Sequence, residues 1–206
     1  MSPRFEKLKN GLNLLLVPCE AESVAVGMFI ASGSAHESAD VAGISHFIEH
    51  MLFKGTASRK QIDITHAIEG KGGNFNAYTS EESTCYFVHM PSECISTALD
   101  ILSDMYKNAA IDEMEFEREK EVVIEELKMY ADDPDTVAME NLQRNLFPDS
   151  QLGAPVGGAE KSVRPLKRMD LKRYIASHYT PEATSVVIVG NFDSENAIEL
   201  TERYFK

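Results

Sequence analysis

The spacing of hydrophobic and polar residues near the start of the chain predicts a β-hairpin followed by further strands. Residues 4–9 and 12–17 have strand character and are joined by Asn10-Gly11, a dipeptide preferred in two-residue hairpin turns. Residues 23–31 are rich in β-branched and apolar side chains and lead into a polar loop, which predicts a third strand. Three more strands are expected at residues 75–79, 83–90 and 184–189.

Helical spacing begins at residues 44–52, where apolar side chains recur every three or four positions. Ser58 with Gln61, and Asp112 with Glu115, have the spacing of helix-capping pairs. We therefore expect further helices at residues 59–69, 91–107, 113 to about 133, 135–147, 169–179 and 194–205, the last capped by Ser194.

The order of these elements favours an α+β fold in which a mostly antiparallel sheet packs against helices. Strands and helices interleave irregularly and the opening hairpin is antiparallel, which argues against a doubly wound parallel sheet. The chain has 206 residues, of which 43% are hydrophobic, so it can bury a substantial core. We expect residues 1–206 to form a single domain.

Charge and cysteine content narrow the classes of function. The 20 Lys and Arg against 33 Asp and Glu give a net charge of −13, which argues against nucleic acid as a partner. The three cysteines form no CxxC motif, which favours a reducing compartment over a disulfide scaffold. No apolar run is long enough to span a bilayer, so we expect no membrane partner. These features predict a bacterial cytoplasmic protein and are also compatible with the mitochondrial matrix.

The strongest chemical signal is the string His46-Phe47-Ile48-Glu49-His50 within the first predicted helix. Its two imidazoles lie at positions i and i+4, one turn apart on one face, with Glu49 beside them. Two histidine nitrogens can bind one Zn²⁺ ion, and a nearby carboxylate can act as general base for water. The H-x-x-E-H order is the inverzincin signature. The alternative, that all three polar groups face solvent, fits poorly with the apolar residues around them.

A catalytic zinc site needs a third protein ligand, and the helix after Asp112 offers several carboxylates. Glu119 and Glu126 are separated by 126 − 119 = 7 positions, which places them two turns apart on one face. Glu125 competes with Glu126 for the ligand role. Adjacent helical residues point about 100° apart, so both cannot face the same metal ion.

Over almost its whole length the chain resembles the pitrilysin and insulinase superfamily of metallopeptidases, which includes mitochondrial processing peptidase and its bacterial relatives. Residues 43–56 are similar to the metal-binding helix of that family, and residues 72–80 to its substrate-binding strand. The third match is a glutamate 126 − 50 = 76 positions after His50. The resemblance implies the metallopeptidase α/β roll. It also implies that His46, His50 and Glu126 are zinc ligands, Glu49 the catalytic base and Glu119 an accessory catalytic carboxylate.

The resemblance further implies that Asn76, Ala77, Tyr78 and Thr79 bind substrate. In the similar enzymes, a peptide adds to this sheet edge and forms main-chain hydrogen bonds with it. On its own, the pattern of these residues predicts only an ordinary strand.

The function implied by this resemblance is a zinc-dependent endopeptidase acting on extended peptides or presequences. Members of the processing-peptidase type combine two related halves, so we expect residues 1–206 to be the metal-bearing N-terminal half. The missing component would be a homologous C-terminal half, a partner subunit or a second copy in a homodimer.

The sequence is also compatible with two alternative functions. A non-catalytic partner subunit is one, although such subunits usually lose the metal-binding residues. A lyase similar to S-ribosylhomocysteine lyase is the other. It would need a cysteine as third ligand, and only Cys85 and Cys94 follow the histidines.

Overall fold

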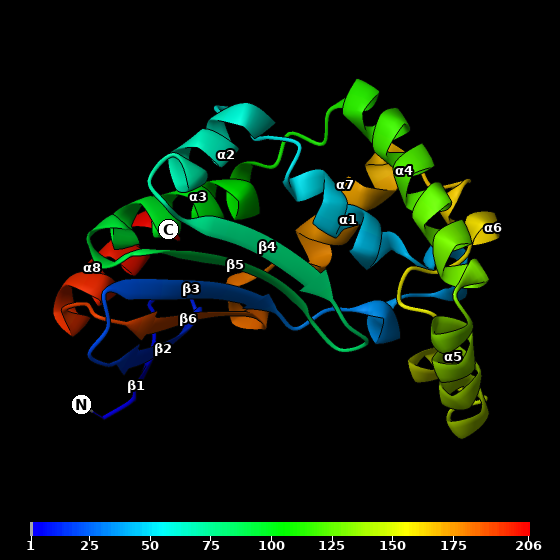
Figure 1. Ribbon diagram of the computed structural model, residues 1–206, viewed down its shortest axis with the longest axis horizontal. Coiled ribbons are helices and arrows are strands. Elements are labelled where there is room, and N and C mark those ends of the chain that lie inside the picture. The colour runs from blue at the N-terminus through cyan, green and yellow to red at the C-terminus, as the bar shows by residue number, and fades with distance from the viewer. Residues whose placement is uncertain (1) are drawn as a thin grey trace.

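Six strands form one sheet in the computed structural model, which describes residues 2–206 (Figure 1). The strand order is β1-β2-β6-β3-β5-β4, and only the β2–β6 pair among these neighbours is parallel. The predicted α+β fold with a mostly antiparallel sheet is confirmed. β4 lies at one edge, so its outer backbone groups have no neighbouring strand among residues 2–206.

The predicted strands and long helices are all present, with small shifts at their ends. The strands are β1 (Arg4–Lys7), β2 (Asn13–Pro18), β3 (Ser23–Ile30), β4 (Asn74–Thr79), β5 (Thr84–Pro91) and β6 (Thr184–Gly190). The helices are α1 (Ile44–Leu52), α2 (Gln61–Glu69), α3 (Ile95–Asn108), α4 (Glu113–Asp132), α5 (Pro134–Leu146), α6 (Glu160–Val163), α7 (Arg168–His178) and α8 (Ser194–Tyr204). The four-residue α6 was not predicted.

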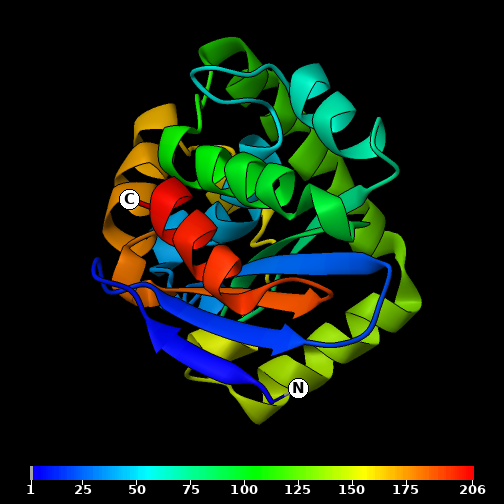
Figure 2. The ribbon, with the colours of Figure 1, turned by 90° about the vertical axis from the view of Figure 1, so that its left-hand side faces the viewer.

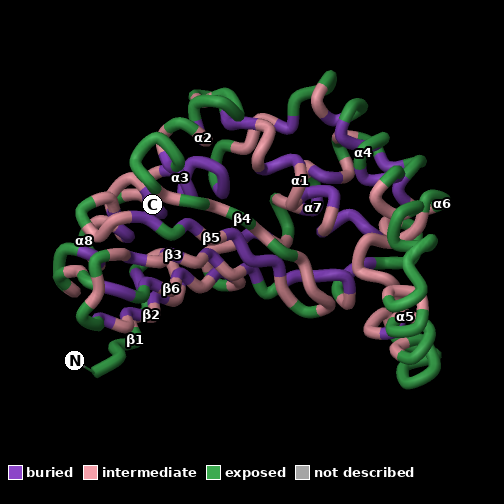
Figure 3. The backbone as a smooth tube through the Cα atoms, in the orientation of Figure 1, coloured by how far each residue is buried: buried purple, intermediate pink, exposed green. Residues whose placement is uncertain are grey.

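Alternation along the central strands shows which face of the sheet carries the core. In β2 and β3, every second residue is buried and those between are half-buried. Helices α3 and α8 lie beside each other over the sheet (Figure 2). Buried segments concentrate between the sheet and the helices, whereas α5 is largely exposed (Figure 3). None of the helices in residues 2–206 combines the length and apolar character needed to cross a membrane.

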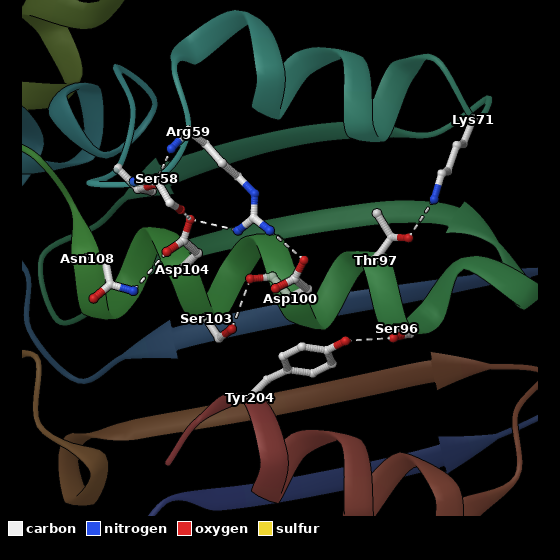
Figure 4. Close-up of polar contacts among 11 residues, drawn as sticks. Ser58, Arg59, Lys71, Ser96, Thr97, Asp100, Ser103, Asp104, Asn108 and Tyr204 are labelled. Atoms are coloured by element: carbon white, nitrogen blue, oxygen red, sulfur yellow. Dashed lines mark hydrogen bonds and ion pairs between the residues drawn. The ribbon is translucent and has the colours of Figure 1, made fainter.

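Two of the predicted helix caps are wrong. Asp63 accepts a hydrogen bond from the Lys60 backbone at the start of α2, and Ser58 donates instead to Asp104 on α3 (Figure 4). At α8 the cap is Asp193 and not Ser194. In both cases an aspartate carboxylate serves the helix N-terminus, where a negative charge also complements the helix dipole.

Helix α1 is fixed at its N-terminus by a buried carboxylate. Glu37 accepts hydrogen bonds from the backbone nitrogens of Gly43, at 2.6 Å, and Ser45, at 2.8 Å. Both groups lie at the start of α1, where backbone N–H groups lack partners within the helix. Burial raises the pKa of Glu37, and these hydrogen bonds oppose that shift.

The opposite end of α1 leads into a loop tied to α3. Arg59 lies 2.7 Å from a carboxylate oxygen of Asp100 and 2.7 Å from one of Asp104 (Figure 4). Asp104 also accepts a hydrogen bond from Thr56 at 2.7 Å. These contacts fix the chain between α1 and α2 against the helical layer.

The contact between α1 and α4 is aromatic and fully buried. Phe47 and Phe116 stack with their ring centroids 5.0 Å apart, and neither ring is more than 1% exposed. This contact sets the distance between the two helices that carry the candidate metal ligands.

Replacing Phe116 with alanine should therefore destabilise the fold strongly. A buried Phe→Ala change costs about 3–5 kcal/mol, because it removes apolar contacts and leaves a cavity. The matched control is Met114→Ala on the same helix, where the side chain is 72% exposed and the change should cost less than about 0.5 kcal/mol. Urea unfolding measures both, and equal losses would contradict the packing described here.

Candidate functional site

The turn spacing of α1 brings the two predicted histidine ligands together. The Nε2 atoms of His46 and His50 lie 3.3 Å apart, and the two rings meet edge to face. Glu49 lies in the same groove of about 340 Å³, which is also lined by residues of β4 and α4. The i, i+4 arrangement predicted from the sequence is therefore present.

Helix α4 adds one carboxylate oxygen to this pair. Glu126 Oε2 lies 3.2 Å from His50 Nε2 and 3.8 Å from His46 Nε2. Ligands bonded at ~2.0–2.1 Å to a tetrahedral zinc are separated by about 1.63 bond lengths, or ~3.3 Å. The three atoms thus have close to the mutual spacing that one zinc ion requires.

The neighbouring carboxylate, Glu125, points away from the histidines. It pairs with Lys128 at 2.7 Å, and its side chain is 67% exposed. The predicted divergence of adjacent helical residues explains this placement. Glu126, in contrast, accepts a hydrogen bond from Tyr130 at 2.6 Å through its other oxygen, Oε1.

Glu119, predicted as an accessory catalytic carboxylate, lies behind His50. Its Oε1 is 3.0 Å from His50 Nδ1, and its Oε2 is 2.6 Å from Lys54 Nζ. The side chain is buried and faces the ring nitrogen opposite the one that meets Glu126. This geometry fixes the orientation of the His50 ring, as carboxylates commonly do for metal-binding histidines.

Burial and neighbouring charge separate the pKa values of the two histidines. Burial, with the charge of His50, lowers the pKa of His46 to about 4. Burial also acts to lower the pKa of His50, but hydrogen bonds to Glu119 and Glu126 outweigh it and raise the value to about 9. The hydrogen bond from His50 lowers the pKa of Glu126 to about 2.

Glu49 has a different environment from the other acids of the site. It accepts a hydrogen bond from the Thr79 hydroxyl at 2.5 Å. Burial raises its pKa, while the Thr79 hydrogen bond acts to lower it. A carboxyl with a raised pKa in a cleft is typical of general bases.

The predicted substrate-binding residues lie in the edge strand β4. Ala77, Tyr78 and Thr79 line the same groove as the histidines, whereas Asn76 does not. Tyr78 is 48% exposed. The free edge of β4 therefore runs directly to the candidate metal ligands.

Several groups at the site were not identified from the sequence. Lys54, just after α1, contacts Glu119, and Tyr130 on α4 contacts Glu126. Only their closeness in sequence to the predicted ligands could have suggested these contacts. Gly157 covers His46: a Cβ there would lie 3.5 Å from His46 Nδ1 and 2.7 Å from Leu127 Cδ2. His46 Nδ1 is buried and has no hydrogen-bond partner among residues 2–206.

Comparison with protein families gives two adjoining matches. Residues 17–160 match the model of "Insulinase (Peptidase family M16)", which covers every candidate site residue. Residues 165–206 match the model of "Peptidase M16 inactive domain". The resemblance inferred from the two sequence segments is thereby confirmed.

Similar proteins include an uncharacterized zinc protease of Bacillus subtilis, 37% identical over 198 residues, or 96% of this chain and 48% of that protein. A probable mitochondrial-processing peptidase subunit beta of Arabidopsis thaliana is 33% identical over 203 residues, or 98% of this chain and 38% of that protein. A protease from Helicobacter pylori has a similar structure, with a TM-score of 0.91 and 25% identity over 99% of this chain and 50% of that one. The chain spans half or less of the length of these proteins.

The histidine environments predict two widely separated titrations in the metal-free protein. His46 should remain neutral down to about pH 4, and His50 should remain protonated up to about pH 9. Glu126→Gln should lower the pKa of His50, because it removes one of the two anions that favour the imidazolium. NMR of the imidazole protons measures both values, with the exposed Glu125→Gln as control. Titration midpoints near pH 6.5 for both histidines would contradict the burial of His46 and the contacts of His50 with Glu119 and Glu126.

Proposed function

The chain belongs to the insulinase family of peptidases, family M16, and from this premise we propose that it is the metal-bearing half of a zinc-dependent endopeptidase. The observation that carries this proposal is the spacing of the His46, His50 and Glu126 ligand atoms, together with a carboxylate in the same groove. Relatives named zinc proteases support zinc as the metal.

The protein residues then have separate tasks. His46, His50 and Glu126 would hold the zinc ion, which supplies a Lewis acid for the scissile carbonyl and for water. Glu49 accepts a proton from the attacking water and delivers it to the leaving amine, as a general base and then a general acid. Glu119 keeps the His50 ring oriented.

The substrate of this proposal is an extended peptide, such as a presequence, paired with the free edge of β4. Antiparallel or parallel addition to an edge strand satisfies backbone groups without requiring a particular sequence. Asn76 to Thr79 would supply these main-chain contacts, and the strand leads the peptide to Glu49.

We infer that full activity requires a second half. The curated relatives are about twice as long as this chain, and the solved structure from Helicobacter pylori is matched over 50% of its length. The second half would be a continuation of the polypeptide, a partner subunit or a second copy of this chain. In this reading, residues 1–206 are the metal-bearing unit.

The two alternatives have less support. A non-catalytic subunit would not need the intact set of His46, Glu49, His50 and Glu126, and the inactive-domain match begins after all of them. For a lyase with cysteine as ligand, the cluster of potential ligands in residues 2–206 contains no cysteine.

Zinc binding provides the first test. Loss of a residue that only hydrogen-bonds to a metal ligand typically weakens metal affinity by about 10–100-fold. Glu126→Gln should weaken zinc affinity by more than this, because it removes a ligand. Glu125→Gln should leave affinity unchanged, since Glu125 faces solvent and Lys128. Competition with a chromogenic chelator measures both variants. Equal losses would show that Glu126 is not a ligand.

Hydrolysis provides the second test. Glu49→Gln should retain zinc and fold but reduce peptide cleavage by about 10²–10⁴-fold, because the amide cannot accept a proton from water. The assay uses a quenched fluorescent peptide and the longest product of the gene, with zinc content and thermal unfolding as controls. Cleavage at the wild-type rate would remove Glu49 from the mechanism.

A further inference from the structure

The side chain of Thr79 connects the edge strand to the carboxylate proposed as general base. Thr79 Oγ1 donates a hydrogen bond of 2.5 Å to Glu49 Oε2. Among residues 2–206, Thr79 is the one side chain that donates a hydrogen bond to this carboxylate. One oxygen of Glu49 is thus held, and the other remains available to a reacting water.

The backbone that carries Thr79 is fixed from two sides. Thr79 pairs with Thr84 at the end of β4, and the Thr84 hydroxyl donates to the Ser32 carbonyl at 2.9 Å. In the following turn, the Ser80 carbonyl accepts a hydrogen bond from Ser34 N at 3.2 Å. A Cβ on Gly33 would lie 2.1 Å from that carbonyl oxygen, so the loop can approach the turn only with glycine there.

The same loop, residues 32–37, also fixes the helix that carries Glu49. Glu37 holds the first backbone nitrogens of α1, as described above. The Tyr174 hydroxyl bridges Ser32, at 3.0 Å, and Ser45, at 3.1 Å. This one loop therefore sets the position of α1 relative to the end of β4, and with it the distance from Glu49 to Thr79.

We propose that Thr79 is a positioning residue whose hydroxyl holds the general base Glu49 in register with a peptide paired along β4. This inference rests on the proposed function and adds a role for the Thr79 side chain to the main-chain contacts expected of residues 76–79. The backbone of Thr79 sets the position of the peptide, and its side chain sets the position of the base. Because both belong to one residue, a shift of the strand moves peptide and base together.

The test compares variants that keep or remove the hydroxyl. Thr79→Val has nearly the same shape without the hydroxyl. Its kcat should fall about 10–100-fold, which is the usual effect of losing a side chain that supports a site residue or of shifting a catalytic group by about 1 Å. KM should change far less, because the main-chain contacts to the peptide remain. Thr79→Ser should restore kcat to within about threefold. Thr79→Ala serves as the second hydroxyl-free variant if the valine variant folds poorly.

The matched control is Thr97→Val on α3, which removes a surface hydroxyl contacting Lys71 at 2.9 Å (Figure 4). It should leave kcat and KM unchanged. All variants are made in the longest product of the gene, and zinc content and thermal unfolding are measured for each. A second readout, independent of activity, is the Glu49 side chain in crystal structures. One conformer is expected with threonine or serine at position 79, and a displaced or mixed conformer with valine.

The outcomes separate this inference from the proposed function. If wild type cleaves peptide, Glu49→Gln does not, and Thr79→Val keeps the wild-type kcat, the positioning role is wrong and the proposed function stands. A Thr79→Ser variant as slow as Thr79→Val would likewise overturn the role of the hydroxyl. If wild type and Glu49→Gln are equally inactive in the full-length protein, the proposed function fails and this inference fails with it.

Discussion

The packing of α1 against α4 is the contact on which the candidate site depends. His50 and Glu126 are 126 − 50 = 76 positions apart in the chain, yet the closest ligand atoms are 3.2 Å apart. The stacked rings of Phe47 and Phe116 lie on the same two helices and hold them at a fixed separation. Because interiors pack densely and resist small displacements, this apolar contact transmits a defined geometry to the polar groups beside it.

Three groups at the site are each held by a hydrogen-bond partner. Glu119 orients His50, Tyr130 holds Glu126, and Thr79 holds Glu49. In the metal-free state, the protonated His50 also offsets the negative charge of Glu119 and Glu126, which keeps these acids ionised despite partial burial. The site is therefore preorganised by protein contacts alone, and such order is what metal binding and proton transfer at a fixed distance require.

Local patterns predicted the elements well but not the contacts between them. The first hairpin and the histidine pair on α1 follow from short-range rules, and the structure contains both. The predicted two-residue turn at Asn10-Gly11 is wrong, because Lys7 pairs with Asn13 and residues 8–12 form the connection. Helical geometry alone could exclude Glu125 and Glu126 acting together, but choosing Glu126 required the family resemblance. The roles of Lys54, Tyr130 and Gly157 depend on how α4 and the 153–159 loop lie over α1, which no local pattern encodes. The predicted helix caps at Ser58 and Ser194 are wrong because, at each helix start, a nearby aspartate accepts the backbone hydrogen bond instead.

We propose that two imidazoles and one carboxylate bind a single zinc ion. X-ray absorption at the zinc edge of the protein loaded with one equivalent tests it most directly. We predict only nitrogen and oxygen neighbours at ~2.0–2.1 Å, with a multiple-scattering signal from two imidazoles, and the loss of one such neighbour or of binding in Glu126→Gln. A sulfur neighbour at ~2.3 Å, or a spectrum unchanged by Glu126→Gln, would contradict the account.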